Sequence, residues 1–299
     1  MSTALLFSGQ GSQHPGMGKA IYDAAPGAYE EIFSVGSDIL GFDLKKTIFE
    51  GTAEELAVTA VSQPAIFTVS LMCARKFLNE GGEFEAVAGH SLGEYAALVM
   101  SGAVDMKTGF TLIKHRAACM DKAAKKNGGK MSAILGLPAE TIEAVCKEVA
   151  DAGDYVVPVN YNTKVQTVIA GSEAGVAKAS ELLKEKGAKR TVELAVAAAF
   201  HSEYMKEAGI EFKELIKDIA INVPEKAFYS NVTGSRLTDF SDIHDIMSRH
   251  LFSPVKFTSE LAEMQAAGID RFVECGPGKA LTGMVRKTLD DVAAEAFDA

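Results

Sequence analysis

The sequence has few cysteines, and they do not cluster. The four residues are scattered and form no Cys-x-x-Cys pair: Cys73, Cys119, Cys146 and Cys275. This scatter argues against a disulfide framework and against a zinc site, and it fits a reducing compartment. We therefore expect no bound metal.

The chain also lacks an excess of basic residues and any long apolar run. Its net charge is −10, and because phosphate binding needs a basic surface, we expect no nucleic acid partner. No apolar run approaches the length of a membrane span, and no positive segment precedes the first apolar residues. These absences predict a cytoplasmic protein that has no membrane partner.

The pattern that is present is an alternation of strands and helices. The 299 residues are 47% hydrophobic, enough for one large core or two domains. Apolar runs predict strands at 3–8, 85–88, 227–230 and 271–275. Apolar spacing predicts helices near 17–24, 27–40, 61–79 (with Pro64 in the first turn), 105–125, 203–219, 254–267 and from 278. Such alternation favours an α/β fold with a largely parallel sheet covered on both faces.

The middle of the chain has a different order of elements. After a predicted linker at 125–129, the order is strand, helix, two strands, helix and strand, at 131–137, 139–152, 155–161, 165–170, 173–186 and 190–196. This is the order of a ferredoxin-like unit. We therefore predict a small inserted domain at 127–197 and a large domain formed by 1–126 and 198–299, with the chain re-entering the large domain at Ala197.

A serine with a glycine two residues away on each side follows the second predicted strand. Gly89 and Gly93 each stand two residues from Ser91, and the period of the apolar residues changes from strand-like to helix-like at the serine. This is the Gly-x-Ser-x-Gly pattern of a nucleophile elbow, which exposes the serine hydroxyl on a strand-to-helix turn. The alternative is that Ser91 is only a helix N-cap.

A second glycine-rich loop follows the first strand, at residues 9–18. It does not fit a dinucleotide site, because the third glycine of Gly-x-Gly-x-x-Gly would fall at His14. It does not fit a P-loop either, because Gly16 is followed by Met17 instead of lysine. We expect a loop whose backbone amides closely approach a ligand.

A serine nucleophile needs a base, and histidine is the usual one. By position we favour His201, since residues that follow strands at the carboxyl edge of a parallel sheet converge on one crevice. His90 should point away from the Ser91 hydroxyl and have a structural role. The remaining histidines are His14, His115, His244 and His250. No carboxylate can be selected to orient His201, and a backbone carbonyl is the alternative.

Arg116 borders the apolar face of the helix predicted at 105–125. An arginine there is more often a surface residue with an apolar stem than a ligand. The residue type and its position are compatible with both roles.

Separated motifs then occur in the order of the malonyl-CoA:acyl carrier protein transacylase family, which the whole chain resembles. They are Gly9–Gln13, Ser62–Ala65, Gly89–Tyr95, Arg116, Asn160–Asn162, Ala199–Ser202, Ser253–Val255 and Glu274–Gly278. The resemblance implies a large domain like an α/β-hydrolase, an inserted ferredoxin-like domain and an active site between them.

The resemblance also implies roles for single residues. Ser91 would accept the acyl group, with His201 as its base, and the backbone N–H groups of Gln10 and Leu92 would form the oxyanion hole. Arg116 would bind the malonyl carboxylate with both of its prongs.

Four further positions are implied at or near the substrate: Phe200, Gln63, Asn160 and His250. Gln63 and Asn160 would either contact the substrate or support residues that do. Phe200 is typical of malonyl-selective members. His250 departs from the family, many of whose members have glutamine there. If the backbone carbonyl orients the catalytic histidine, the change is harmless; if the side chain takes part, His250 adds a titrating group near the site.

The reaction implied is a ping-pong transfer from malonyl-CoA to the phosphopantetheine thiol of acyl carrier protein, for fatty acid or polyketide synthesis. We expect no resident cofactor and a monomer. A serine thioesterase or hydrolase with the same elbow is the main alternative, and a non-catalytic docking module for carrier protein is another. Acyl carrier proteins are typically acidic, and so is this chain. The carrier protein should therefore dock on a local cluster of Lys and Arg residues, which the sequence does not locate.

Overall fold

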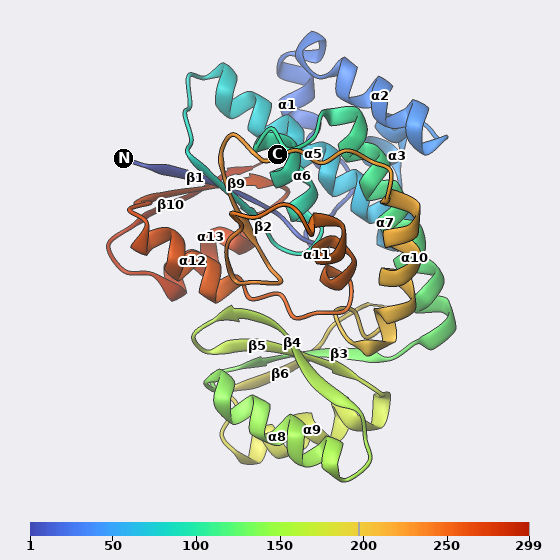
Figure 1. Ribbon diagram of the computed structural model, residues 1–299, viewed down its shortest axis with the longest axis vertical. Helices are drawn as coiled ribbons and strands as arrows, with labels where there is room; N and C mark the ends of the chain where they lie inside the picture. The colour runs from blue at the N-terminus through green and yellow to red at the C-terminus, as the bar shows by residue number, and fades with distance from the viewer. Residues whose placement is uncertain (197, 299) are drawn as a thin grey trace.

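Figure 1 shows the computed structural model, which describes residues 1–196 and 198–298. A six-stranded sheet and its helices form the larger part, and a four-stranded sheet with two helices lies beneath it. The predicted fold class, α/β with a mostly parallel sheet and a separate smaller sheet, is confirmed.

The larger sheet has the strand order β10-β9-β1-β2-β7-β8. Its strands are β1 (Thr3–Phe7), β2 (Ala86–Gly89), β7 (Ala227–Ser230), β8 (Ser235–Arg236), β9 (Arg271–Gly276) and β10 (Ala293–Asp298). All neighbouring pairs are parallel except β7 with β8. Phe7 pairs with Gly89 on one side and with Cys275 on the other, so the loops that follow β1, β2 and β9 leave the sheet at the same edge.

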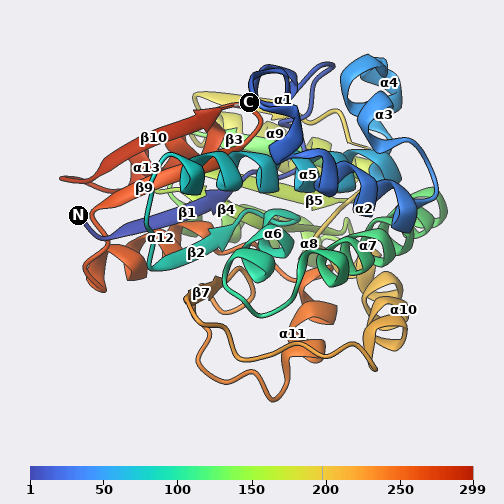
Figure 2. The ribbon, with the colours of Figure 1, turned by 90° about the horizontal axis from the view of Figure 1, so that it is seen from above.

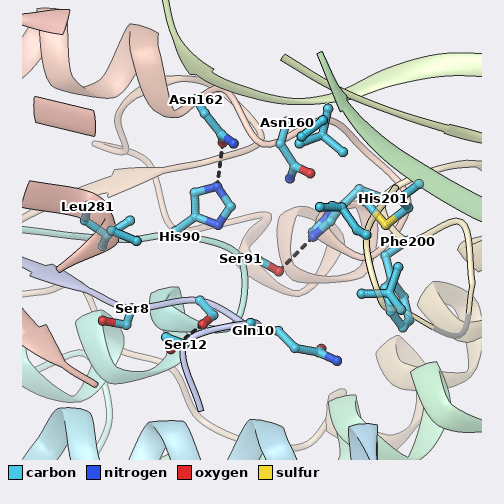
Figure 3. Close-up of a pocket in the computed structure, with 18 of the residues that line it drawn as sticks. Ser8, Gln10, Ser12, His90, Ser91, Asn160, Asn162, Phe200, His201 and Leu281 are labelled. Atoms are coloured by element: carbon cyan, nitrogen blue, oxygen red, sulfur yellow. Dashed lines mark hydrogen bonds between the residues drawn. The ribbon is translucent and has the colours of Figure 1, made fainter. Parts of the chain in front are cut away.

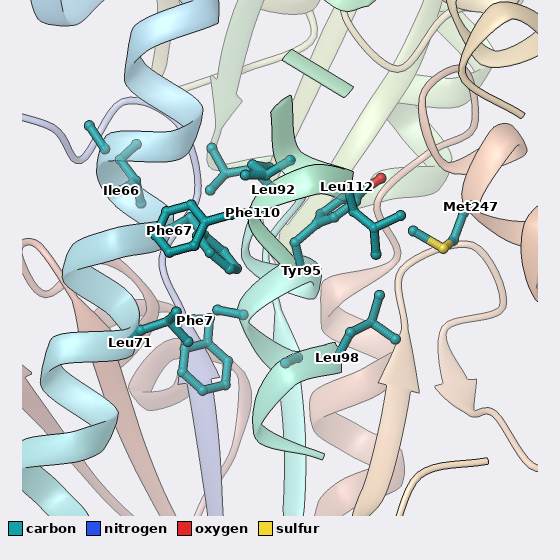
Figure 4. Packing of buried hydrophobic residues seen from close by; sticks show 14 of the residues in the cluster. Phe7, Ile66, Phe67, Leu71, Leu92, Tyr95, Leu98, Phe110, Leu112 and Met247 are labelled. Carbon is teal, nitrogen blue, oxygen red and sulfur yellow. The ribbon is translucent and has the colours of Figure 1, made fainter. Parts of the chain in front are cut away.

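Helices cover both faces of this sheet because successive residues of a strand point to opposite faces. Leu5 and Phe7 of β1 belong to the core on one face of the sheet, and Ala4 and Leu6 belong to the core on the other. Figure 4 shows the first packing, in which Phe7 lies among side chains of α5 (Thr59–Asn79), α6 (Gly93–Met100) and α7 (Met106–Asn127). The second face is covered by α12 (Phe257–Ala266) and α13 (Ala280–Thr288).

Shorter helices surround these layers, and Figure 2 shows α1, α2, α3 and α4 around one end of α5. They are α1 (Lys19–Ala24), the 3-10 turn η1 (Pro26–Ala28), α2 (Glu30–Leu40), α3 (Leu44–Glu50), α4 (Ala53–Ala57), the 3-10 turn η2 (Glu203–Met205), α10 (Lys206–Ile216) and α11 (Ile243–His250). Within the described chain, no helix is both long enough and apolar enough to cross a membrane.

The structure differs from the elements predicted from the sequence in three respects. Helix α5 begins at Thr59, so Pro64 lies inside the helix and not in its first turn as predicted. Helix α7 continues to Asn127, and only Gly128 and Gly129 are left of the predicted linker. The sequence patterns also missed five elements: α3, α4, α11, β8 and β10.

The smaller sheet has the order β4-β5-β3-β6 and is antiparallel throughout. Its elements are β3 (Lys130–Leu135), α8 (Ala139–Asp151), β4 (Val156–Thr163), β5 (Gln166–Gly171), α9 (Glu173–Glu185) and β6 (Arg190–Glu193). The predicted order of strands and helices is therefore present. The domain boundaries at 126/127 and 197/198 stay a prediction, and Ala197 and Ala299 lie outside the described residues.

The two sheets are joined in two regions. Where the chain leaves and re-enters the larger part, the N–H of Ala199 donates to the carbonyl of Gly128 at 3.1 Å. Elsewhere the N–H of Tyr161 donates to the carbonyl of Val255 at 2.9 Å, and the N–H of Val255 to the carbonyl of Val159 at 2.8 Å. The small sheet is thus held beside the carboxyl edge of the large one.

Candidate active site

Ser91 lies on the turn between β2 and α6, the context that the motif requires. Its φ of 53° is left-handed, which is uncommon for a residue with a side chain. Glycine is required on both sides of it. A Cβ on Gly89 would lie 1.9 Å from the carbonyl carbon of Gly93, and a Cβ on Gly93 would lie 2.1 Å from the carbonyl oxygen of Phe7.

The hydroxyl of Ser91 meets the ring of His201, as Figure 3 shows. Ser91 Oγ and His201 Nε2 are 2.7 Å apart. On the other side of the ring, His201 Nδ1 lies 3.0 Å from the backbone oxygen of His250. A carbonyl oxygen only accepts, so Nδ1 carries the proton and Nε2 presents its lone pair to the serine. Of the two ways to orient His201 that the sequence left open, the structure has the backbone carbonyl.

His201 is uncharged near neutral pH. Burial, followed by the positive charge of Arg116 and the proximity of His90, lowers the pKa of His201 to about 3. A neutral imidazole is the form that can take a proton from a hydroxyl. The pair therefore has the geometry and the protonation state of a nucleophile with its base.

Arg116 is only 1% exposed, so the structure excludes the surface role considered for it. Its Nη2 donates to Ser91 Oγ at 3.0 Å and its Nη1 to Gln63 Oε1 at 2.7 Å, while Cζ lies 5.3 Å from the centre of the Tyr95 ring. No partner accepts from Nε among the described residues. The guanidinium is thus buried beside the nucleophile and has hydrogen-bonding capacity to spare.

No carboxylate within the described chain forms an ion pair with Arg116. Glu94 is close enough to affect its pKa, but burial raises the pKa of Glu94 itself to about 8. That acid is therefore mostly uncharged at neutral pH. A buried cation without a counter-charge is costly unless an anion arrives to pair with it.

A cavity of about 260 Å³ opens in front of Ser91, between the two sheets. One wall is the glycine-rich loop after β1 together with Leu281 and Met284 of α13. The opposite wall comes from the small sheet and the segment that follows it: Met131, Ala133, Asn160, Asn162, Gln166, Val168, Leu194 and Val196. Phe200, His201 and Met120 complete it. His90 bridges the two parts, with Nε2 lying 2.8 Å from Asn162 Oδ1.

The backbone N–H groups of Gln10 and Leu92 have no hydrogen-bond acceptor among the described residues. The loop that carries Gln10 packs against the elbow, since a Cβ on Gly9 would lie 2.8 Å from the carbonyl oxygen of His90. Leu92 follows the nucleophile directly. Both N–H groups therefore remain available to an oxyanion, and this role stays a prediction.

Gln63 and His250, two of the positions that the resemblance implied at or near the substrate, do not line the cavity, and neither does Arg116. Gln63 accepts from Arg116, and its own amide lies 3.5 Å from Met120 Sδ. The ring of His250 is buried behind His201, with Nε2 lying 3.1 Å from Asn231 Oδ1. Both side chains contact other site residues, and a contact with the substrate stays a prediction for them.

The sequence patterns missed Asn231 and Asn162 as single site residues, although Asn162 lay within a quoted motif. No local signal marks Asn231, which follows β7 and accepts from the Ser91 N–H at 2.8 Å. No group of three or more His, Cys, Asp or Glu residues in the described part of the chain is arranged to hold a metal ion.

Comparisons with known proteins agree with this geometry. The family model "Acyl transferase domain" matches residues 4–297. A malonyl CoA-acyl carrier protein transacylase of Bacillus subtilis is 41% identical over 284 residues, which cover 95% of this chain and 89% of that protein.

Solved structures extend the likeness to the fold. An acyl-carrier-protein S-malonyltransferase from Burkholderia pseudomallei has a TM-score of 0.95 at 38% identity, covering 100% of this chain and 97% of the other. A malonyl-transacylase solved in complex with its type II polyketide synthase acyl carrier protein has a TM-score of 0.94 at 36% identity, covering 99% and 96%. With its sequence matched over nearly its full length and a serine–histidine pair beside its cavity, the chain is an acyltransferase and belongs to the family of the malonyl-CoA:acyl carrier protein transacylases.

Proposed function

We propose that the chain transfers a malonyl group from malonyl-CoA to the phosphopantetheine thiol of an acyl carrier protein, with Ser91 as the intermediate acyl carrier. The observation that carries the proposal is the buried guanidinium of Arg116, 3.0 Å from the nucleophilic oxygen and without a carboxylate partner in the described chain. An acyl group that ends in a carboxylate would supply the missing charge, and arginine binds carboxylates with two parallel hydrogen bonds.

In the first half-reaction, Ser91 Oγ attacks the thioester carbonyl while His201 Nε2 takes the hydroxyl proton. The N–H groups of Gln10 and Leu92 stabilise the negative oxygen of the tetrahedral intermediate. The carbon–sulfur bond then breaks, and His201 returns the proton to the CoA thiolate as it leaves. The product of this half-reaction is a malonyl ester of Ser91.

The second half-reaction reverses these roles. His201 takes the proton of the phosphopantetheine thiol, whose sulfur attacks the serine ester, and the proton passes to Ser91 Oγ as the ester bond breaks. Water must be kept from the ester for transfer to prevail. The small sheet covers one side of the cavity with apolar side chains, including Met131 and Val168.

Phe200 lines the cavity next to His201, where it would limit the bulk of the acyl group. Asn160, also in the wall, would contact the substrate. The malonyl-transacylase of similar fold that was solved with its carrier protein supports such a protein as the partner. We further propose a cytoplasmic monomer that has no resident cofactor.

Intact-protein mass spectrometry after brief mixing with malonyl-CoA tests the proposal. The wild type should gain the mass of one malonyl group and lose it again when acyl carrier protein is added. Ser91→Ala should gain nothing, whereas Ser241→Ala, at an exposed serine, should behave like the wild type. An unmodified wild type would favour the docking module. Release of free malonate without carrier protein would favour the hydrolase.

A further inference from the structure

Beneath the elbow lies a buried asparagine that the mechanism above does not use. Asn231 has no exposed surface and immediately follows β7. Because β7 pairs in parallel with β2, the ends of these two strands are adjacent, and Asn231 arrives directly behind the nucleophile.

All four hydrogen-bonding positions of the Asn231 side chain are in use. Its Oδ1 accepts from the N–H of Ser91 at 2.8 Å and lies 3.1 Å from His250 Nε2. Its Nδ2 donates to the carbonyl of Gly89 at 2.7 Å and to Glu260 Oε1 at 2.8 Å. A carbonyl only accepts and a backbone N–H only donates, so these partners fix which end of the amide is oxygen.

This orientation also fixes the tautomer of His250. Because Asn231 Oδ1 is an acceptor, His250 Nε2 must carry the proton. Its unprotonated Nδ1 then faces Glu94 Oε2 at 3.4 Å, while Glu94 Oε1 accepts from the N–H of Asn231. Among the described residues, the ring therefore makes its only hydrogen bond through Nε2, to Asn231.

His250 in turn orients the base. It is the last residue of α11, where carbonyl groups have no intrahelical partner, and its carbonyl accepts from His201 Nδ1 at 3.0 Å. One amide therefore reaches both members of the pair. It holds the left-handed backbone of Ser91 directly, and it holds His201 through His250.

We propose that Asn231 is a positioning residue for acyl transfer. Its side-chain oxygen holds Ser91 and His201 at hydrogen-bonding distance from each other. This inference deepens the proposed function and rests on it. It predicts that the acceptor atom matters more than the volume of the side chain, because a shift of about 1 Å at a reacting atom costs on the order of 10²-fold in rate.

The test compares Asn231→Leu with Asn231→Asp, which are of similar size. A neutral aspartic acid keeps an acceptor toward Ser91 and can donate to Gly89, whereas leucine can do neither. We expect the rate of Ser91 malonylation to fall about 100-fold in the leucine variant and less than about 10-fold in the aspartate variant, with KM for malonyl-CoA nearly unchanged in both. Asn222→Leu, at an exposed asparagine, is the matched control. Equal losses in two folded variants, or a leucine variant as fast as the wild type, would overturn the proposal.

A separate measurement tests the indirect contact from Asn231 to His201 through His250. It also tests the proposal if Asn231→Leu does not fold. His250→Leu keeps the backbone carbonyl but removes the ring that Asn231 holds. The Nδ1 proton signal of His201 in the NMR spectrum, assigned by its loss in His201→Ala, should shift or broaden, and malonylation should slow. His250→Gln, which restores an amide donor, should recover the rate. An unchanged signal and rate in His250→Leu would refute positioning through His250.

Failure of the proposed function can be told apart from failure of this inference. If the wild type is not malonylated, the assigned substrate is wrong. The rate at which phenylmethanesulfonyl fluoride labels Ser91 then still reports how strongly the serine is activated. We expect this labelling rate to fall much more in Asn231→Leu than in Asn231→Asp.

Discussion

Ser91 and His201 approach each other from backbone positions that are both left-handed, with φ angles of 53° and 60°. Their side chains meet at 2.7 Å although 110 positions (201 − 91) separate them in the chain. Left-handed backbone at a residue with a side chain persists only where the surroundings enforce it. The two turns therefore fix the direction of both reactive groups before any substrate binds.

Replacing the base should slow both half-reactions. His201→Ala removes the group that takes the proton from Ser91, and such groups typically contribute 10²- to 10⁴-fold in rate. We expect kcat to fall about 10³-fold, measured as malonyl transfer to acyl carrier protein. His244→Gln, at a half-buried histidine away from the cavity, should retain the wild-type rate. A small loss in His201→Ala would mean that another group is the base.

The pH profile should be flat across the range in which an ordinary histidine titrates. Since burial, Arg116 and His90 lower the pKa of His201 to about 3, the base stays unprotonated as the pH falls from 8 to 5. For the free enzyme, kcat/KM reports this pKa. We expect kcat/KM for malonyl-CoA to remain nearly constant over that range, measured at constant ionic strength. A tenfold loss per pH unit below pH 6.5 would contradict the assigned environment.

Selectivity for an acidic acyl group should depend on Arg116. Arg116→Ala removes the only positive charge that contacts Ser91 among the described residues, so malonyl transfer should fall far more than acetyl transfer. Sites built around a polar partner can discriminate by about 10⁴-fold, and we expect the malonyl-to-acetyl ratio of kcat/KM to fall at least 100-fold. Arg236→Ala, at an exposed arginine, is the control. Equal losses with both donors would refute the role.

The stability of the protein should fall as the pH rises toward 8, partly through Glu94. Burial raises the pKa of Glu94 from 4.5 to about 8, so the folded state holds a proton that the unfolded state releases between these values. The stabilisation is thus present at pH 4.5 and is lost as the pH approaches 8. The lowered pKa values of His201 and His250 act in the opposite direction, but only below about pH 6.5.

Glu94→Gln isolates this effect. Between pH 6.5 and 8 the wild type should lose about 1–2 kcal/mol of unfolding free energy relative to the variant. Urea unfolding at the two pH values measures the difference. Glu83→Gln, at an exposed glutamate, should show no such change. Parallel pH dependences of the wild type and Glu94→Gln would show that Glu94 ionises normally.

The elbow should not tolerate a methyl group. In Gly89→Ala the new Cβ would lie 1.9 Å from the backbone of Gly93, and neither strand nor helix can move without losing its packing. We expect a loss of about 3 kcal/mol or more in unfolding free energy, or no folded protein. Gly283→Ala in α13 is the matched control, because its Cβ would have no neighbour within 4 Å. A Gly89→Ala variant of normal stability would mean that the turn is looser than described.

Sequence reasoning located the parts of the site that depend on local patterns. Gly89, Ser91 and Gly93 lie within five residues, and the change from strand to helix spacing can be read directly around them. The order of strands and helices in the inserted unit is equally local. The roles given to Gln10, Leu92 and Arg116 came from likeness to a family and not from spacing.

The features that the sequence did not predict depend on contacts between distant segments of the chain. Asn231 acquires its role only because β7 pairs beside β2, 140 positions (231 − 91) from Ser91. β10 contains three alanines and a glutamate, residues with low strand propensity, and it becomes a strand by pairing with β9. Likewise the burial of Arg116 reflects packing on Tyr95 and Gln63, which a helical pattern alone does not reveal.

The hydrogen bond between Ala199 and Gly128 brings together the two ends of the segment that carries the small sheet. A segment with adjacent ends can be gained or exchanged without rerouting any other connection of its host. The nucleophile, the base and the arginine lie outside residues 130–196, whereas that segment supplies cavity wall and the Asn162 contact to His90. Exchanging residues 130–196 should therefore change which acyl donors fit, while the contacts among Ser91, His201 and Arg116 remain.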